Sequence, residues 1–193
     1  MKISSFQSFS LNEYPGEICA VVFTQGCNFN CKYCFNPELK SIENPEETYI
    51  NSDEVLNTLK SRKDKITAVS VTGGEPLLQD DIMEFLCDLK RLGYKIKLNT
   101  NGSYYMRLKH VVGFNLVDFI RMDIKAPSDK YEDITCCRVR MDEIEKSIKL
   151  IKKSGIEHEF HTVMDEDVLD ENDIKKIREW IKDDKNYNVG EKK

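Results

Sequence analysis

Short apolar runs alternate with helical patterns along this chain, and this alternation narrows the possible folds more than any other feature. The strand-like runs are short, apolar and partly β-branched, and they occupy residues 18–24, 67–72, 95–100, 117–124 and 158–163. Segments with apolar residues at helical spacing occupy residues 51–63, 80–92, 104–111, 141–153 and 170–182. Alternating strands and helices favour an α/β fold built on a parallel sheet.

The length of the chain and its last elements set the expected extent of the domain. At 193 residues, we expect a single domain with its own core over residues 1–183. The runs above give five strands, and only Tyr187–Val189 remains as a candidate for a sixth. Residues 184–193 are polar, so we expect a frayed tail and a sheet that ends before residue 183.

Polar and glycine-containing segments follow the first three expected strands. A cysteine-rich loop comes after the first, Gly73-Gly74-Glu75-Pro76 after the second, and Asn99-Thr100-Asn101 closes the third. Parallel α/β folds place their functional sites at the carboxyl ends of the strands. We therefore expect these three segments to meet in one shared site.

The cysteine-rich loop carries Cys27, Cys31 and Cys34, spaced so that three thiolates can converge on one metal centre. The loop holds no fourth cysteine, whereas a closed structural zinc site or an ordinary iron–sulfur cluster uses four protein ligands. Three ligands leave one coordination position open for chemistry. The alternative is a zinc site or ordinary cluster completed by a remote ligand, for which the candidates are Cys19, Cys136, Cys137, His110, His158 and His161.

The other cysteines and the overall charge exclude several classes of protein. Seven cysteines, an odd number, with no export signal argue against a disulfide framework and favour a cytoplasmic protein. Cys136-Cys137 is interpreted as a structural or incidental pair. A net charge of −5 without a basic block argues against binding to nucleic acid. The longest apolar run, Ile18–Phe23, is far shorter than the ~20 residues of a membrane span, so no membrane association is expected.

These motifs resemble those of the radical S-adenosylmethionine (radical SAM) superfamily. The cysteine spacing together with Gly73-Gly74-Glu75-Pro76 carries the resemblance to the superfamily. Flanking runs make the chain most similar to the activating enzymes of anaerobic ribonucleoside-triphosphate reductase, and they lie at residues 10–11, 14–16, 21–29, 36–39, 72–76, 100–102 and 122–127. The resemblance covers most of residues 10–182 and implies a partial (βα) barrel.

The resemblance also implies the cofactors. Cys27, Cys31 and Cys34 would bind three irons of a [4Fe–4S] cluster, and the amino and carboxylate groups of S-adenosylmethionine (SAM) would bind the fourth. One electron would then break the S–C5′ bond and give methionine and a 5′-deoxyadenosyl radical. Tyr33, next to the last cysteine, would shield one face of the cluster or simply pack in the loop.

The turns after the second and third strands have implied roles toward SAM. Gly73 and Gly74 would let the backbone approach the methionine amino group, since neither carries a β-carbon. Glu75, followed by Pro76, would accept a hydrogen bond from that ammonium or brace the turn. Asn99, Thr100 and Asn101 would supply short polar contacts, although such residues are also common turn formers.

The fourth and fifth strands contribute further implied contacts. Asp123 and Lys125 share one face because side chains alternate along a strand, and they would contact the ribose and carboxylate of SAM or pair with each other. His161 stands where the family often has an arginine, and it would contact SAM or be structural. Phe35 stands where the family usually has a histidine, so no role is carried over to that side chain.

Three functions are compatible with these residues. The first is activation of a glycyl radical enzyme, most closely anaerobic ribonucleoside-triphosphate reductase, with reduced ferredoxin or flavodoxin as electron donor. It is favoured because the chain is short and has no second cysteine cluster. The second is a small-molecule radical SAM enzyme such as a 7-carboxy-7-deazaguanine synthase-like enzyme. The third is a non-catalytic metal-binding module.

Overall fold

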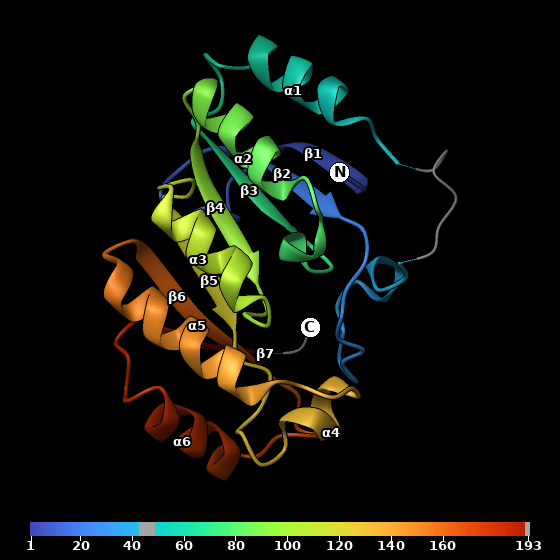
Figure 1. The fold of residues 1–193 in the computed structure, drawn as a ribbon. Helices are drawn as coiled ribbons and strands as arrows, with labels where there is room; N and C mark the ends of the chain where they lie inside the picture. The colour runs from blue at the N-terminus through green and yellow to red at the C-terminus, as the bar shows by residue number, and fades with distance from the viewer. Residues whose placement is uncertain (43–48, 192–193) are drawn as a thin grey trace.

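A curved sheet is the centre of the computed structural model, which describes residues 1–42 and 49–191 (Figure 1). Its strands in the described residues are β1 (Ile3–Ser10), β2 (Cys19–Thr24), β3 (Ala68–Gly73), β4 (Lys95–Thr100), β5 (Phe119–Asp123), β6 (Glu157–Met164) and β7 (Tyr187–Glu191). The spatial order is the sequence order, β1 to β7. β1 is antiparallel to β2, and every later neighbour is parallel.

Helices cover one face of this sheet. They are α1 (Ser52–Ser61), α2 (Ile82–Arg91), α3 (Tyr105–Gly113), α4 (Tyr131–Thr135), α5 (Met141–Ser154) and α6 (Glu171–Trp180), with short 3₁₀ turns η1 (Pro37–Leu39) and η3 (Pro76–Leu78). Figure 1 shows α2, α3 and α5 in a row along the sheet, with the cysteine-rich loop apart from them. The alternating order confirms the predicted α/β class. Because β1 and β7 lie at opposite edges of the sheet, the barrel is partial.

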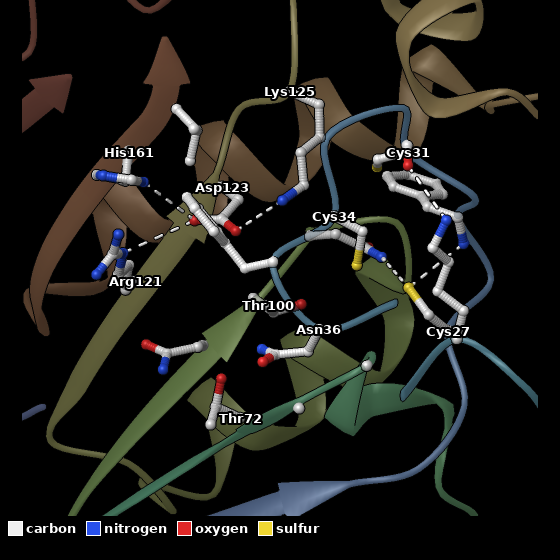
Figure 2. A pocket seen from close by; sticks show the side chains of 18 of the residues that line it. Cys27, Cys31, Cys34, Asn36, Thr72, Thr100, Arg121, Asp123, Lys125 and His161 are labelled. Atoms are coloured by element: carbon white, nitrogen blue, oxygen red, sulfur yellow. Dashed lines mark hydrogen bonds and ion pairs between the residues drawn. The ribbon is translucent and has the colours of Figure 1, made fainter. Parts of the chain in front are cut away.

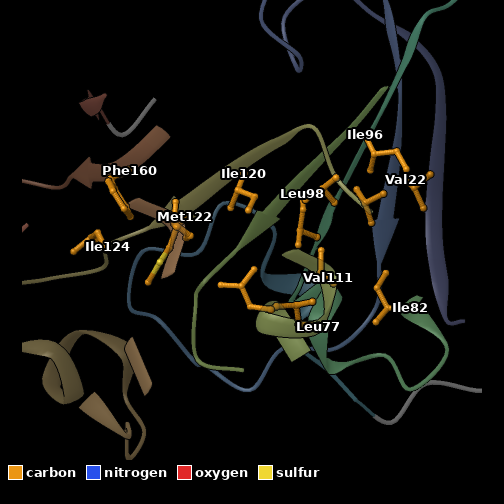
Figure 3. Packing of buried hydrophobic residues seen from close by; sticks show 14 of the residues in the cluster. Val22, Leu77, Ile82, Ile96, Leu98, Val111, Ile120, Met122, Ile124 and Phe160 are labelled. Atoms are coloured by element: carbon orange, nitrogen blue, oxygen red, sulfur yellow. The ribbon is translucent and has the colours of Figure 1, made fainter. Parts of the chain in front are cut away.

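The main core lies between the sheet and its helices. Leu98 points from β4 toward Leu77 and Val111, and Ile120 and Met122 lie on the neighbouring β5 (Figure 3); all five are fully buried. Burial of large apolar side chains is the main favourable term in folding, at about 1.5–3 kcal/mol for each. This packing fixes β3, β4 and β5, whose carboxyl ends carry the polar segments described above.

The predicted end of the sheet is wrong. Residues 187–191, placed in a frayed tail by the sequence analysis, form β7, which pairs in parallel with β6 from Phe160↔Tyr187 to Met164↔Glu191. The strand begins with a buried Tyr187, whose amide donates to the carbonyl of Asp184 at 3.0 Å. A tight turn and one anchoring aromatic residue therefore hold a segment whose other side chains are mostly exposed.

The first strand was also absent from the predicted elements. β1 alternates half-buried and exposed residues between its buried ends and pairs with β2 at the edge of the sheet. Its serines dilute the apolar signal, because one face of an edge strand is solvated. In the described part of the chain, no helix is long and apolar enough to cross a membrane.

Candidate active site

The carboxyl ends of β2 to β6 surround a cavity of about 210 Å³ (Figure 2). The predicted site residues that line it are Cys27, Cys31, Tyr33, Cys34, Gly73, Gly74, Asn99, Thr100, Asn101, Asp123, Lys125 and His161. The expected meeting of the cysteine loop with the turns after β3 and β4 is therefore found in the structure. Glu75 and Pro76 are buried and are not among the described residues that line the cavity.

The cysteine loop is held against the segment at the end of α4. Asn30 N donates to Thr135 O at 2.9 Å, and Lys32 N donates to Ile134 O at 3.1 Å. Beside these bonds, the ring of Phe29 makes an edge contact with Tyr131 at a centroid distance of 6.3 Å. The loop between the first two cysteines is therefore positioned by α4, a helix that the sequence patterns did not predict.

The three thiols surround the cavity from this one loop. Burial raises the pKa of Cys27 to about 12, and burial also raises the pKa of Cys31. Such thiols stay protonated at neutral pH until a metal displaces the proton. Among the described residues, no three His, Cys, Asp or Glu side chains form a single-ion site, and Cys27, Cys31 and Cys34 all line the one cavity. Three soft ligands around one space fit an iron–sulfur cluster with an open position.

Gly73 and Gly74 allow two backbone segments to approach each other. A β-carbon on Gly73, whose φ is +122°, would lie 2.3 Å from Thr24 N, and one on Gly74 would lie 2.0 Å from Gly26 O. Gly74 N donates to Thr24 O at 3.0 Å, and the next amide donates to Gly26 O at 2.8 Å. The two glycines thus join the turn after β3 to the start of the cysteine loop.

Glu75 braces the turns from inside the protein. Its carboxylate accepts hydrogen bonds from Leu77 N at 3.0 Å, Thr100 Oγ1 at 2.8 Å and Asn101 N at 2.7 Å. Burial raises the pKa of Glu75 to about 7, although these hydrogen bonds act in the opposite direction. Of the two roles open to Glu75, the contacts correspond to bracing, which ties the end of β4 to the turn after β3.

The asparagines at the end of β4 differ in their hydrogen bonding. Asn101 is engaged within the site, since its Nδ2 donates to Asn28 Oδ1 at 3.0 Å and its Oδ1 accepts from Ser103 N at 2.9 Å. Asn99 Nδ2 makes a long contact with Ser70 Oγ at 3.5 Å. Asn99 Oδ1 is buried without a hydrogen-bond partner in the described structure, so it offers a free acceptor at the cavity.

A cluster of charged side chains lines the opposite wall. Lys125 Nζ lies 2.7 Å from Asp123 Oδ2, while Arg121 Nε and His161 Nδ1 lie 3.7 and 3.6 Å from Asp123 Oδ1. Figure 2 shows these three side chains directed toward Asp123. Burial disfavours ionisation of Asp123, but the charge of Lys125 and its neighbours outweighs burial and holds the pKa of Asp123 well below its usual range. Asp123 is therefore ionised, and the predicted Asp123–Lys125 pair is present.

Tyr33 connects the cysteine loop to this charged wall. Its hydroxyl donates a hydrogen bond to the carbonyl of Lys125, and its ring is buried beside the loop. Burial raises the pKa of Tyr33, so the phenol remains a neutral donor. This contact fixes the position of the loop relative to the end of β5.

Several residues that line the cavity are not among the predicted site residues. They are Glu13, Phe29, Phe35, Asn36, Lys40, Thr72, Arg121 and Val163. Arg121 could have been found, because the alternation that pairs Asp123 with Lys125 places residue 121 on the same face. Lys40 and Asn36 had no periodic signal, since they reach the cavity from an irregular loop.

The cysteines outside the loop do not line the cavity. All seven cysteines lie in the described residues and are free thiols. Cys19 is fully buried, and Cys87 is half-buried against the core. Cys136 directly follows α4, has a left-handed φ of 51° and is exposed. Its backbone therefore forms the turn that ends the helix.

Comparison with known proteins identifies the family. The model of the Radical SAM superfamily matches residues 21–181. A Methanocaldococcus jannaschii protein named as a glycyl-radical enzyme activating enzyme is 31% identical over 186 residues, which are 94% of this chain and 75% of the relative. The pyruvate formate-lyase-activating enzyme of Clostridium pasteurianum is 33% identical over 143 residues, which are 69% of this chain and 57% of that enzyme.

Solved structures share the fold. Streptococcus suis SuiB bound to S-adenosylmethionine superposes with a TM-score of 0.69 at 19% identity, over 88% of this chain and 39% of SuiB. The chain therefore shares its fold with less than half of the length of SuiB. The family uses a [4Fe–4S] cluster and SAM, and the three thiols around the cavity fit that cluster. From the matched residues and this arrangement, the chain belongs to the radical SAM superfamily of enzymes.

Proposed function

We propose that this protein generates a glycyl radical on a partner enzyme. The observation that carries the proposal is the likeness of 94% of the chain to a glycyl-radical enzyme activating enzyme. The partial barrel supports it, because β1 and β7 do not pair with each other and the sheet is open between its edges. A polypeptide segment of a partner needs such an open side to reach the cavity.

The proposed reaction has two parts, a one-electron reduction and the transfer of one hydrogen atom. When bound, the cluster and SAM would supply the radical chemistry: one electron from a reduced donor would break the S–C5′ bond, giving methionine and a 5′-deoxyadenosyl radical. Transfer of a hydrogen atom from a glycine of the partner would then give 5′-deoxyadenosine and the glycyl radical. Cys27, Cys31 and Cys34 would hold the cluster. The buried walls of the cavity limit access of water to a reactive species.

The other lining residues orient SAM in this proposal. Lys125, held at 2.7 Å by Asp123, presents an ammonium to the methionine carboxylate. Asn99 Oδ1, buried and without a partner in the described structure, accepts a hydrogen bond from SAM. Tyr33 keeps the cysteine loop at a fixed distance from this wall by donating to the carbonyl of Lys125.

The partner that we propose is anaerobic ribonucleoside-triphosphate reductase. This assignment rests on the resemblance of residues 122–127 and of the segments beside the cysteines to the activating enzymes of that reductase. Reduced ferredoxin or flavodoxin would supply the electron. Because the reductase and this electron donor are expected in the cytoplasm, we propose that the reaction takes place there.

The test is electron paramagnetic resonance (EPR) after anaerobic incubation with the reductase, SAM and a reductant. We expect a glycyl radical doublet, together with 5′-deoxyadenosine. The control is Cys34→Ser, which removes one cluster ligand and should abolish both signals. The proposal fails if the cluster-loaded enzyme forms 5′-deoxyadenosine but leaves the reductase without a glycyl radical.

A further inference from the structure

Lys40 contacts the cysteine loop at two places through different parts of the residue. It follows η1, where its own amide donates to Pro37 O at 3.2 Å. Its carbonyl accepts a hydrogen bond from Cys27 N at 3.2 Å, next to the first thiol. Lys40 is therefore held in a tight turn while its backbone fixes the beginning of the loop.

The side chain of Lys40 fixes the other end of the same segment. Nζ donates to Asn30 Oδ1 at 2.7 Å and to Cys31 O at 3.3 Å. One residue thus bonds the backbone at both Cys27 and Cys31. The distance between the first two thiols depends on the course of this segment, and Lys40 restrains it from both ends.

The turn that carries Lys40 is itself anchored inside the protein. The buried side chain of Gln25 donates to Glu38 O and Ser41 O, both at 2.9 Å, on either side of Lys40. Gly26 N donates to Leu39 O at 2.8 Å. These bonds hold the backbone of the turn in place and thereby limit where the Lys40 side chain can reach.

The hydrogen-bond acceptors of the Lys40 ammonium are neutral. Its two acceptors are an amide oxygen and a backbone carbonyl, and the residue lines the same cavity as the three cysteines. Lys125 also lines the cavity, but its ammonium contacts the carboxylate of Asp123. The two contacts of Lys40 therefore restrain the ammonium without neutralising it.

We propose that Lys40 is a positioning residue for the cluster, which fixes the Cys27–Cys31 segment and raises the reduction potential through its positive charge. A cluster bound by thiolates gains negative charge on reduction, and a nearby cation stabilises the more negative state. The inference rests on the cluster at the three cysteines and not on the identity of the partner protein.

The test compares three substitutions in the anaerobically reconstituted enzyme. Lys40→Met removes the charge and the donor, Lys40→Gln keeps a donor without the charge, and Lys40→Arg keeps both. Lys32→Gln is the matched control, because Lys32 is an exposed lysine in the same loop and the change in net charge is equal. The measurements are iron and sulfide content and the midpoint potential from EPR-monitored titration, without any partner protein.

We expect Lys40→Gln and Lys40→Met to shift the midpoint potential to more negative values, and Lys40→Arg and Lys32→Gln to leave it unchanged. We also expect Lys40→Met to bind less iron than Lys40→Gln, since it loses both side-chain hydrogen bonds. A fully loaded Lys40→Gln cluster with the wild-type potential would overturn the electrostatic role. Full iron content in Lys40→Met would overturn the positioning role. Neither result depends on whether a glycyl radical forms.

Discussion

Glu75 is a buried carboxyl whose ionisation opposes folding. Burial raises its pKa to about 7, whereas the unfolded chain has the ordinary glutamate value near ~4.3. The folded protein therefore binds the proton more tightly between these two values. Linkage predicts that the free energy of unfolding falls as pH rises from about 4 to about 7, by about 3 kcal/mol at most.

Glu75→Gln should remove this part of the pH dependence. Urea unfolding of the metal-free protein gives the free energy of unfolding at pH 5 and at pH 7.5. The altered hydrogen bonds lower this free energy equally at both pH values, so their effect cancels when the two free energies are subtracted. Glu84→Gln, an exposed change on α2, is the control and should keep the wild-type difference. An unchanged difference in Glu75→Gln would mean that another group titrates.

Lys125 supplies a restrained positive charge at the cavity. Lys125→Met removes it and leaves Asp123 with Arg121 and His161 at 3.7 and 3.6 Å. Because a hydrogen bond to a charged group contributes about 1.5–3 kcal/mol, SAM should bind roughly 10- to 100-fold more weakly. Equilibrium binding of SAM to the cluster-loaded enzyme measures this, with Lys109→Met on the exposed side of α3 as control. An unchanged dissociation constant would exclude contact between Lys125 and SAM.

The sequence was sufficient to locate most of the site but not the role of each residue. Residues that follow strands were predicted to meet, since parallel strands end at one edge, and the cavity confirms it for the cysteine loop and the turns after β3 and β4. Gly73 and Gly74 stay predicted as positions where the backbone approaches the methionine amino group, and the structure adds that their missing β-carbons make room for the backbone of Thr24 and Gly26. Contacts between distant backbone segments have no periodic signal in a sequence.

Among the elements, strands with a buried apolar interior were predictable and edge strands were not. β4 was predicted with its observed bounds, because the fully buried Ile96 and Leu98 alternate with polar residues at strand spacing. β1 and β7 have one neighbour each, so solvent replaces much of the packing that gives a central strand its apolar pattern. The sequence therefore predicted the central strands of the partial barrel but not its two edge strands, β1 and β7.

β7 also positions a residue of the cavity wall. A β-carbon on Gly190 would lie 2.7 Å from His161 Nε2, so the glycine leaves space for the imidazole beside Asp123. Gly190→Ala should displace His161 or the strand, lower the free energy of unfolding by about 1–3 kcal/mol and weaken SAM binding. Chemical unfolding and SAM titration measure the two effects.

Gly113→Ala is the matched control for this substitution. Its added β-carbon would have no atom within 4 Å, and the residue lies in α3. Alanine favours a helix over glycine by roughly 0.5–1 kcal/mol, so this variant should be slightly more stable than the wild type. Equal stability and SAM affinity in wild type and Gly190→Ala would show that β7 does not restrain His161.

On the scale of the whole molecule, stability should decrease from the centre of the sheet toward its open edges. β3 and β4 are paired on both sides and their inner residues are buried, whereas β7 pairs only with β6 and exposes Asn188 and Val189. Local opening requires less free energy where fewer contacts are lost, and amide exchange follows that free energy. Peptides from β7 should therefore exchange at least roughly tenfold faster than those from β4, by hydrogen–deuterium exchange mass spectrometry. Equal protection of β7 and β4 would mean that the edge is covered, and a partner segment could then not enter the cavity from that side.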